Sequence, residues 1–343
     1  MSDLPFPAIL QCVTESELAE HWRSRLRPFW QQLQHGQFKG VAGVPIHYSF
    51  CVTPGATRAW VISSGRIETA IKYTELIYEL QQAGYSVFIL DHRGQGRSGR
   101  MQADPQLGYV ADFHDYQQDL VTFLTDIVKP AGYQQHLLLA HSMGAAIATA
   151  LLTLPRWQQW QHFFSGAVLC SPMFGIYTGK VPKWLAEPAA LLYCRLGQRL
   201  FAEQRYFIGQ TTYQDKPFAL NELTGSLARY QALRDCYRTE PLLQLGGVTC
   251  QWLHQAILAM RQLLTYSSRC ATPILLLQGT DDNVVANDAQ RRWFAQLPAT
   301  LPKQLVEIPQ AKHEILMEQD PLRQLALATI NNFLSSLNAT AKT

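Results

Sequence analysis

The sequence has few charged side chains and no long run of them. Only 16% of its 343 residues are Asp, Glu, Lys or Arg, the formal net charge is +3, and no stretch of Lys and Arg reaches five residues. A protein that binds nucleic acid through its surface carries clustered positive charge, so no nucleic-acid partner is expected. Apolar residues make up 47% of the chain, which excludes a disordered protein and predicts a sizeable core.

Closely spaced cysteines are also missing. The seven cysteines form no C-x-x-C pair, and most of them stand among apolar residues. An odd number of widely separated cysteines is typical of free thiols in a reducing compartment. We therefore expect neither a disulfide framework nor a metal site.

Long apolar runs are absent as well. The longest uncharged stretches, 130–155 and 157–179, are interrupted by Gln, His, Ser and Gly. Neither offers the roughly 20 consecutive apolar residues that a membrane-spanning helix needs. The first residues lack a basic start followed by an apolar stretch of secretory length, so no signal peptide is predicted. With a bacterial source assumed, these absences predict a cytoplasmic protein.

What the sequence does contain is a series of short, mostly apolar runs that alternate with helical patterns. Six such runs lie at 59–63, 85–91, 136–140, 166–170, 273–278 and 304–309. Strands buried on both faces of a parallel sheet have this composition. Two earlier runs, 39–41 and 45–52, indicate a leading β-hairpin. Strands and helices in alternation predict an α/β fold with a doubly wound, mostly parallel sheet.

One interval breaks this alternation. The run that ends at Cys170 and the run that starts at Pro273 are separated by 102 residues, whereas a crossover needs about a dozen or somewhat more. Three helical patterns fill the interval, at 183–201, 223–237 and 251–264. We predict a core of residues 1–171 and 266–343 with an inserted helical cap, residues 172–265, over the C-terminal edge of the sheet, where ligands of open α/β sheets bind. The alternative is that these helices only extend the core.

The stretch HLLLAHSMGAAIATALL has the strand–turn–helix order of a nucleophile elbow. A strand ends near Ala140, Ser142 follows, and Gly144 opens an apolar helix. In such an elbow a sharp, strained turn projects the serine hydroxyl above the sheet. The first glycine of the usual G-x-S-x-G pattern is replaced here by Ala140. We predict Ser142 as a nucleophile, and the alternative is a tight turn whose serine only caps the helix.

A serine hydroxyl needs a base to remove its proton, and the base needs an acid to orient it. In the α/β-hydrolase fold the acid and then the histidine follow the serine in the chain, on loops after later strands. Asp281 and Asp282 follow one apolar run, and His313 follows the last. We predict Asp282 as the acid, with Asp281 as the alternative, and His313 as the base. We expect His141 to face away from Ser142.

Acyl transfer also needs donors for the oxyanion of its intermediate. One should be the backbone N–H of Met143, the residue after the predicted nucleophile. We expect the second from the loop after the run 59–63, where Gly65 permits a close turn and the backbone N–H of Arg66 follows. This chemistry needs no metal and no organic cofactor.

One competing motif matches the sequence pattern of a dinucleotide-binding loop. Gly94, Gly96 and Gly99 have the spacing G-x-G-x-x-G directly after the run 85–91. No amphipathic helix follows it, its strand is not the first of the sheet, and no acidic residue ends a strand about 20 positions later. We therefore set NAD binding aside and predict a loop that fixes the chain beneath the catalytic site.

The motifs SGRIETAIKYTEL, DHRGQGRSGR, LLLAHSMG, SPMFGI, LGGVTCQW, LLLQGTDD and AKHEIL occur in the order seen in bacterial lysophospholipases of the L-two type. From about Arg25 to Leu337 the chain resembles these proteins and the wider monoacylglycerol-lipase-like branch of the α/β-hydrolase fold. Relatives in that branch usually have His-Gly where this chain has Ser64-Gly65. The resemblance implies hydrolysis of the single acyl ester of a lysophospholipid or another monoacyl ester, with the triad and oxyanion donors at the positions named above.

The cap should then guide the acyl chain into the site. Trp184, Leu192, Trp252 and Ile257 are candidates for lining an apolar tunnel or for a surface that touches the bilayer, and the alternative is that they pack the cap on the sheet. Because the substrate resides in membranes, we expect peripheral contact with the inner membrane, and no obligate protein partner is evident. A monoacylglycerol lipase, a general carboxylesterase or an acyltransferase would use the same triad. A non-catalytic binding protein on this fold is a further alternative.

Overall fold

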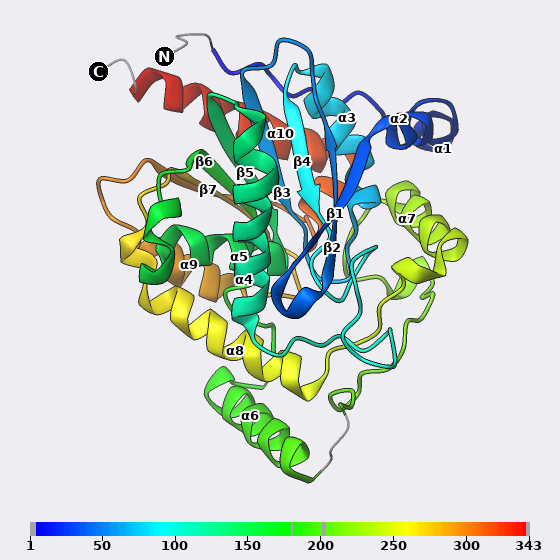
Figure 1. Ribbon diagram of the computed structural model, residues 1–343, viewed down its shortest axis with the longest axis vertical. Helices are drawn as coiled ribbons and strands as arrows, with labels where there is room; N and C mark the ends of the chain where they lie inside the picture. Colours follow the sequence, from blue (N-terminus) through cyan, green and yellow to red (C-terminus); the bar gives the residue numbers. More distant parts are fainter. Residues whose placement is uncertain (1–4, 180, 201–203, 341–343) are drawn as a thin grey trace.

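An eight-stranded sheet runs through the middle of the molecule (Figure 1), with the strand order β1-β2-β4-β3-β5-β6-β7-β8. The computed structural model describes residues 5–179, 181–200 and 204–340. The strands are β1 (Gln34–Lys39), β2 (Pro45–Cys51), β3 (Arg58–Ser63), β4 (Ser86–Leu90), β5 (Gln135–His141), β6 (Phe164–Cys170), β7 (Ile274–Gly279) and β8 (Lys303–Ile308). All pairs from β4 through β8 are parallel, and β1 and β2 form an antiparallel hairpin at one edge. The predicted doubly wound, mostly parallel sheet of the α/β-hydrolase fold is confirmed.

Burial explains why these segments form strands. Every residue of β3, β4 and β7 is buried, as expected for strands that are covered on both faces. The edge strand β8 is largely half-buried or exposed, which accounts for the charged residues in its sequence KQLVEI. The strand at the opposite edge of the sheet, β1, is similarly exposed.

Helices cover both faces of the sheet (Figure 1). One face packs against α3 (Thr74–Gln82) and α10 (Asp320–Thr340), and the other against α4 (Phe113–Phe123), α5 (Ser142–Thr153) and α9 (Asn287–Ala295). Near the N-terminus, α1 (Leu18–His21) and α2 (Arg27–Gln32) are joined by a π-helical turn and lie beside α3. Pro28 stands in the first turn of α2, directly after this π-helical turn.

The long interval between β6 and β7 holds three helices. They are α6 (Lys183–Leu200), α7 (Leu227–Thr239) and α8 (Cys250–Thr265). Helix α8 packs on α4 and α5 and buries Trp252, Ile257 and Met260 in the same core cluster as the sheet. Helix α6 packs on the outer side of α8, and α7 lies apart from both (Figure 1). The division into a core and a cap at residues 172–265 remains a prediction, because α8 is continuous with the core.

In the described part of the chain, we find no helix that combines the length and the apolar character needed to cross a bilayer.

Candidate active site

Three side chains that are far apart in the sequence meet at the carboxyl ends of the strands. Ser142 follows β5, Asp282 follows β7 and His313 follows β8. The Nε2 atom of His313 lies 2.9 Å from Ser142 Oγ, and its Nδ1 atom lies 2.8 Å from Asp282 Oδ2. All three residues are buried. The structure therefore brings the three residues predicted for the triad into one hydrogen-bonded chain.

The turn at Ser142 has the strained geometry of a nucleophile elbow. Ser142 has φ +50°, a conformation that L-residues other than glycine rarely adopt. At Gly144 a Cβ atom would collide with the backbone carbonyl groups of Ser63 and Ser64, so only glycine permits this approach. Ala140, which replaces the first glycine of the pattern, is fully buried at the end of β5. Strand and helix thus pack closely enough to hold the hydroxyl at the base of a cavity.

Two backbone N–H groups fix the acid. Those of Val284 and Val285 donate to Asp282 Oδ1 over 2.8 and 3.1 Å, which leaves Oδ2 free for His313. Burial alone would raise the pKa of Asp282, but the hydrogen bond and charge of His313, together with these N–H groups, hold that pKa below its ordinary value. Asp281 is exposed and accepts a hydrogen bond from the Thr280 hydroxyl, so it does not orient His313.

The position of His141 differs from our expectation. Its ring does not face away from the site but packs on His313, with 4.8 Å between the ring centroids. Its Nε2 atom lies 3.2 Å from the carbonyl oxygen of His313, and its Nδ1 atom lies 2.9 Å from a carboxylate oxygen of Glu68. Because Nε2 contacts the His313 backbone and Nδ1 faces Glu68, His141 packs against the predicted base rather than competing with it.

The comparisons with known proteins agree with this geometry. Residues 55–320 match the Hydrolase_4 family model, described as serine aminopeptidase, S33. The chain belongs to this serine hydrolase family.

Relatives of this hydrolase include a bacterial lysophospholipase and a human monoglyceride lipase. It is 38% identical to lysophospholipase L2 of Escherichia coli (strain K12) over 95% of this chain and 94% of that protein. It is 26% identical to monoglyceride lipase of Homo sapiens over 86% of this chain and 89% of that protein. Among solved structures, a soluble variant of monoglyceride lipase from Saccharomyces cerevisiae superposes with a TM-score of 0.69 at 18% identity, covering 89% of this chain and 95% of that one. At that identity the likeness shows the fold alone.

A buried ionic cluster beside the triad of this hydrolase was not predicted from the sequence. Its centre is Glu68, which accepts hydrogen bonds from the Gly65 backbone N–H and from Lys72 Nζ (2.5 Å), and which pairs with His141. Lys72 also pairs with Glu314 over 2.6 Å. Burial alone would raise the pKa of Glu68, but the charges and hydrogen bonds of His141 and Lys72 hold it well below its ordinary value. The cluster connects the loop after β3, through His141 and Glu314, to His313, the predicted base.

That loop carries Arg66, one of the two predicted oxyanion donors. Gly65 is anchored through Glu68, and Gln95 Nε2 donates to the Gly65 carbonyl over 2.7 Å. Gln95 lies in the glycine-rich loop after β4, so this loop fixes the chain beneath the site, as we predicted. The other predicted donor, Met143, is the second residue of α5, where backbone N–H groups have no intrahelical acceptor. The roles of Arg66 and Met143 remain predictions.

Ser142 and His313 open into a cavity of about 630 Å³. Its apolar lining comes mainly from the loops after β6 and β7 and from α8, and includes Met173, Ile176, Phe207, Val248, Trp252, Leu253, Val284 and Val285. Of the four cap residues predicted to line a tunnel, Trp252 lies in this wall and Ile257 is buried in the core. Trp184 and Leu192 do not line the cavity: they are 78% and 61% exposed on α6, because α6 packs on α8 through its opposite face.

Proposed function

We propose that this serine hydrolase cleaves the acyl ester of lysophospholipids, releasing a free fatty acid and a glycerophospho-alcohol. The observation that carries the proposal is the chain of hydrogen bonds from Asp282 through His313 to Ser142 at the base of a largely apolar cavity. The names of the bacterial relatives, lysophospholipase L2 and probable lysophospholipase L2, support this class of substrate.

The mechanism begins with proton transfer from the Ser142 hydroxyl to Nε2 of His313 as Oγ attacks the ester carbonyl carbon. The negative Asp282 carboxylate stabilises the imidazolium that forms, and its depressed pKa keeps it charged. Backbone N–H groups of Met143 and Arg66 hold the oxyanion. The ester C–O bond breaks, and the leaving alcohol takes the proton from His313. A water molecule, deprotonated by His313, then attacks the acyl-enzyme and releases the fatty acid.

Other monoacyl esters remain the alternative substrates. The mammalian relatives are named monoglyceride lipases, and such a lipase, a general carboxylesterase or an acyltransferase would use the same three residues. A non-catalytic binding protein would not need a strained serine in hydrogen-bond contact with a histidine. The geometry at Ser142 therefore favours an enzyme over a binding module.

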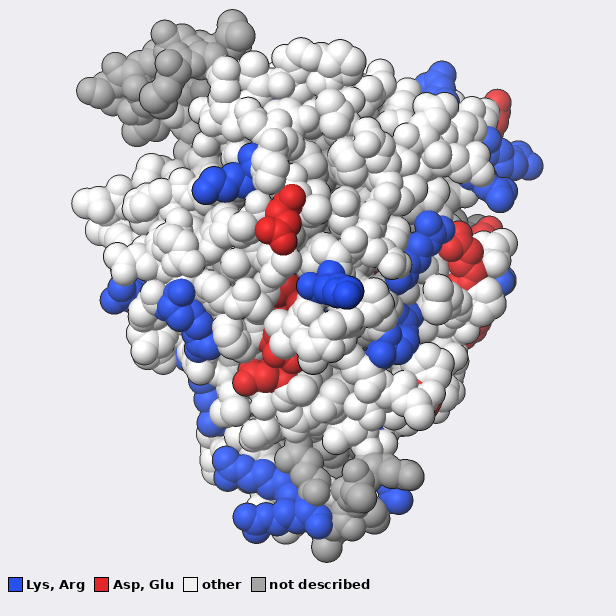
Figure 2. All heavy atoms as spheres, viewed as in Figure 1, with Lys and Arg blue, Asp and Glu red and all other residues white. Residues whose placement is uncertain are grey.

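We also propose peripheral membrane contact through the outer face of α6. Exposed apolar side chains follow this face in a stripe, and they are Trp184, Leu185, Leu192, Tyr193 and Leu196. Figure 2 shows Lys and Arg side chains gathered at the end of the molecule where Figure 1 places α6. An apolar stripe flanked by basic residues is typical of helices that lie on an anionic membrane surface. Trp184 and Leu192 then act at the bilayer rather than in a tunnel.

The test is release of fatty acid from a series of lysophosphatidylethanolamines of increasing acyl length, with the wild-type protein and Ser142→Ala side by side. Turnover that the substitution abolishes supports both the triad and the substrate class. Turnover that survives in Ser142→Ala rules out this nucleophile. Cleavage of a short-chain ester without cleavage of any lysophospholipid keeps the triad and rejects the substrate.

A further inference from the structure

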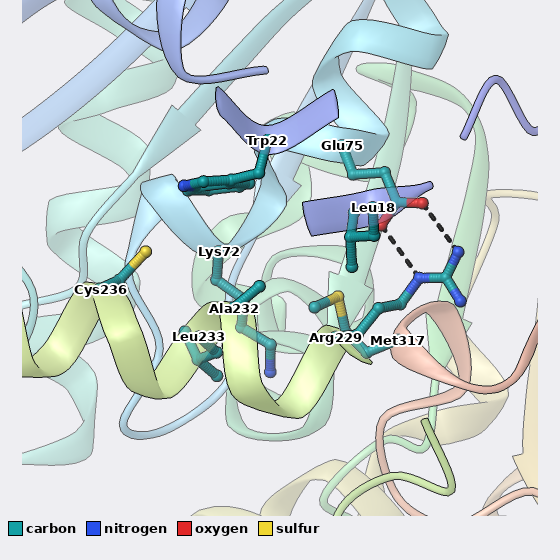
Figure 3. A pocket seen from close by; sticks show the side chains of 9 residues that line it. All are labelled: Leu18, Trp22, Lys72, Glu75, Arg229, Ala232, Leu233, Cys236 and Met317. Carbon is teal, nitrogen blue, oxygen red and sulfur yellow. Dashed lines mark hydrogen bonds and ion pairs between the residues drawn. The ribbon is translucent and has the colours of Figure 1, made fainter. Parts of the chain in front are cut away.

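Helix α7 carries three arginines whose surroundings differ. The first, Arg229, is buried and joins α7 to the core. Its guanidinium donates two hydrogen bonds to the Glu75 carboxylate, over 2.9 and 3.0 Å, and one to Asp320 over 2.9 Å. Figure 3 shows Arg229 and Glu75 pointing toward one another across a small cavity between α7 and the core. This arginine is neutralised and has a structural role.

The third arginine, Arg238, is on the outer surface and is also paired. It contacts Asp215 over 2.7 Å and Asp235 over 2.6 Å, and its side chain is 57% exposed. Between the two stands Arg234, for which we find no carboxylate partner in residues 5–179, 181–200 and 204–340. Arg234 lines the same cavity as Ser142 and His313.

Tyrosine rings hold the Arg234 guanidinium in place. Its Cζ atom lies 4.7 Å from the ring centroid of Tyr230, 5.5 Å from that of Tyr237 and 5.7 Å from that of Tyr213. Its Nη1 donates to the Tyr213 hydroxyl over 3.1 Å, while its Nε is buried and has no acceptor in the described part of the chain. Cation–π contacts orient the charge but satisfy none of its N–H groups. Nε is inaccessible from the cavity, so a ligand there would be bound through the Nη atoms of the guanidinium.

The part of the cavity wall that holds Arg234 and its tyrosines lies close to the reacting centre. The Tyr237 hydroxyl donates to the carbonyl oxygen of Ile67 over 2.5 Å, and Ile67 directly follows the predicted oxyanion donor Arg66. The Arg66 side chain also lines the cavity, and its guanidinium lies 5.3 Å from the Trp252 ring. Burial lowers the pKa of Arg66 to about 10, so it stays charged near neutral pH.

The carboxylates of the cavity do not cancel these charges. Glu68 and Glu314 are both paired with Lys72, and Glu222 is exposed. The cavity wall therefore combines an apolar part, formed mainly by the loops after β6 and β7 and by α8, with three cationic side chains: Arg66 after β3, Lys216 before α7 and Arg234 on α7. A lysophospholipid has the same division, with its acyl chain on one side of the ester carbonyl and its phosphate on the other.

We propose that Arg234, held by its three tyrosines, binds the phosphodiester of the lysophospholipid head group while the ester carbonyl lies at Ser142. The inference rests on the proposed function and adds the group that distinguishes a lysophospholipid from a neutral monoacyl ester. A guanidinium suits this role because its planar fork of N–H donors matches two phosphate oxygens. Arg234 would contact the substrate without taking part in bond breaking.

The experiment compares two substrates with the same acyl chain, a lysophosphatidylethanolamine and a monoacylglycerol. In Arg234→Gln, KM for the lysophospholipid rises by about tenfold or more, since hydrogen bonds to charged groups are of that strength. For the monoacylglycerol, kcat and KM stay within about twofold of the wild-type values, because this substrate has no phosphate for Arg234 to contact. Arg234→Lys keeps the charge without the fork and gives an intermediate KM. Arg238→Gln removes the same charge from the same helix outside the cavity and leaves both substrates unaffected.

A second arm does not require lysophospholipid turnover. Glycerophosphoethanolamine should inhibit monoacylglycerol hydrolysis by the wild type competitively, and several-fold more weakly in Arg234→Gln. Inorganic phosphate that inhibits as strongly as the head group would show a general phosphate site and overturn the head-group assignment. Equal losses on both substrates, or an unchanged KM for the lysophospholipid, would overturn the role of Arg234. A wild type that cleaves only the monoacylglycerol refutes the proposed function. Inhibition by glycerophosphoethanolamine, compared between the wild type and Arg234→Gln, then tests separately whether Arg234 binds a phosphate.

Discussion

The carboxylate partner of His313, the predicted base, is selected by backbone geometry rather than by residue type. Asp281 and Asp282 are neighbours with the same side chain, yet only Asp282 receives the N–H groups of Val284 and Val285 that aim its second oxygen at His313. Asp281 projects outward and is exposed. The pair therefore offers a matched control within one loop.

Asp282→Asn should lower kcat for ester hydrolysis by about 10³-fold or more, because an amide cannot hold the imidazole in the required tautomer or stabilise its charged form. Asp281→Asn should leave kcat within about twofold of the wild type. Steady-state hydrolysis of a soluble short-chain ester measures both. A strong loss in Asp281→Asn with a weak one in Asp282→Asn would reverse the assignment.

At the level of single residues, the sequence predicted which side chains meet at the site but not what supports them. Ser142, Asp282 and His313 could be placed because each follows a recognisable strand in a fixed chain order. Glu68 pairs with His141, and its partner Lys72 pairs with Glu314, so the cluster joins three distant segments and no local pattern reveals it. The spacing of Glu68 and Lys72, four residues apart, was the one local signal. His141 was misplaced for the same reason.

At the level of elements, periodicity identified the helices of the interval 172–265 but not their exposed faces. Helix α6 carries apolar residues on two faces, and its pattern does not tell which face meets α8. Leu191 and Cys194 are buried, whereas Trp184 and Leu192 are exposed. Exposed apolar side chains gathered on one helix face, as on the outer side of α6, are typical of an interaction surface.

Replacing Trp184 and Leu192 together by serine should weaken binding to vesicles of phosphatidylethanolamine and phosphatidylglycerol by about tenfold or more, since each buried apolar side chain contributes about 1.5–3 kcal/mol. Hydrolysis of a monomeric soluble ester should not change, because neither side chain lines the cavity. Co-sedimentation with the vesicles measures the binding. Leu242→Ser, at a residue that is 61% exposed outside α6, is the control. Equal vesicle binding by all three proteins would refute the membrane role of α6.

At the level of the whole molecule, the buried cluster around Glu68 makes stability depend on pH in both directions. The pKa of Glu68 is held well below 4.5, so its stabilising effect is present above that value and is lost as the pH falls through the folded-state pKa. Burial alone would lower the pKa of His141, but Glu68 raises it above 6.5. The contribution of His141 is therefore complete below 6.5 and is lost as the pH rises through its folded-state pKa.

Glu68→Gln should therefore lower the free energy of unfolding most between these two values and flatten its dependence on pH on both sides. Urea denaturation across the acid, neutral and mildly alkaline range measures this profile. Glu307→Gln, which removes an exposed partner of Arg291, should shift the curve little at any pH. A Glu68→Gln profile parallel to that of the wild type would show that the cluster is not the source of the pH dependence.

The overall architecture was the most predictable level. Five of the six predicted runs are buried strands, since strands covered on both faces have a distinctive composition, and the sixth is the half-exposed edge strand β8. The leading hairpin forms, but its first strand is Gln34–Lys39 and not 39–41, because Val41 lies in a 3-10 turn between the two strands. The position of α8 against α4 and α5 was not predictable, because a helix inserted between two strands can pack on the core or above it with the same pattern. Chain order alone does not fix that choice.

The three residues of the triad follow β5, β7 and β8, and β8 is the last strand at its edge of the sheet. No partly assembled sheet that lacks β7 or β8 brings a base to Ser142. Recovery of ester hydrolysis after denaturation therefore measures complete assembly of the sheet. Activity returns only when the final two strands have docked, whatever secondary structure has formed before. A nascent or damaged chain without β7 and β8 therefore has no base that could activate Ser142.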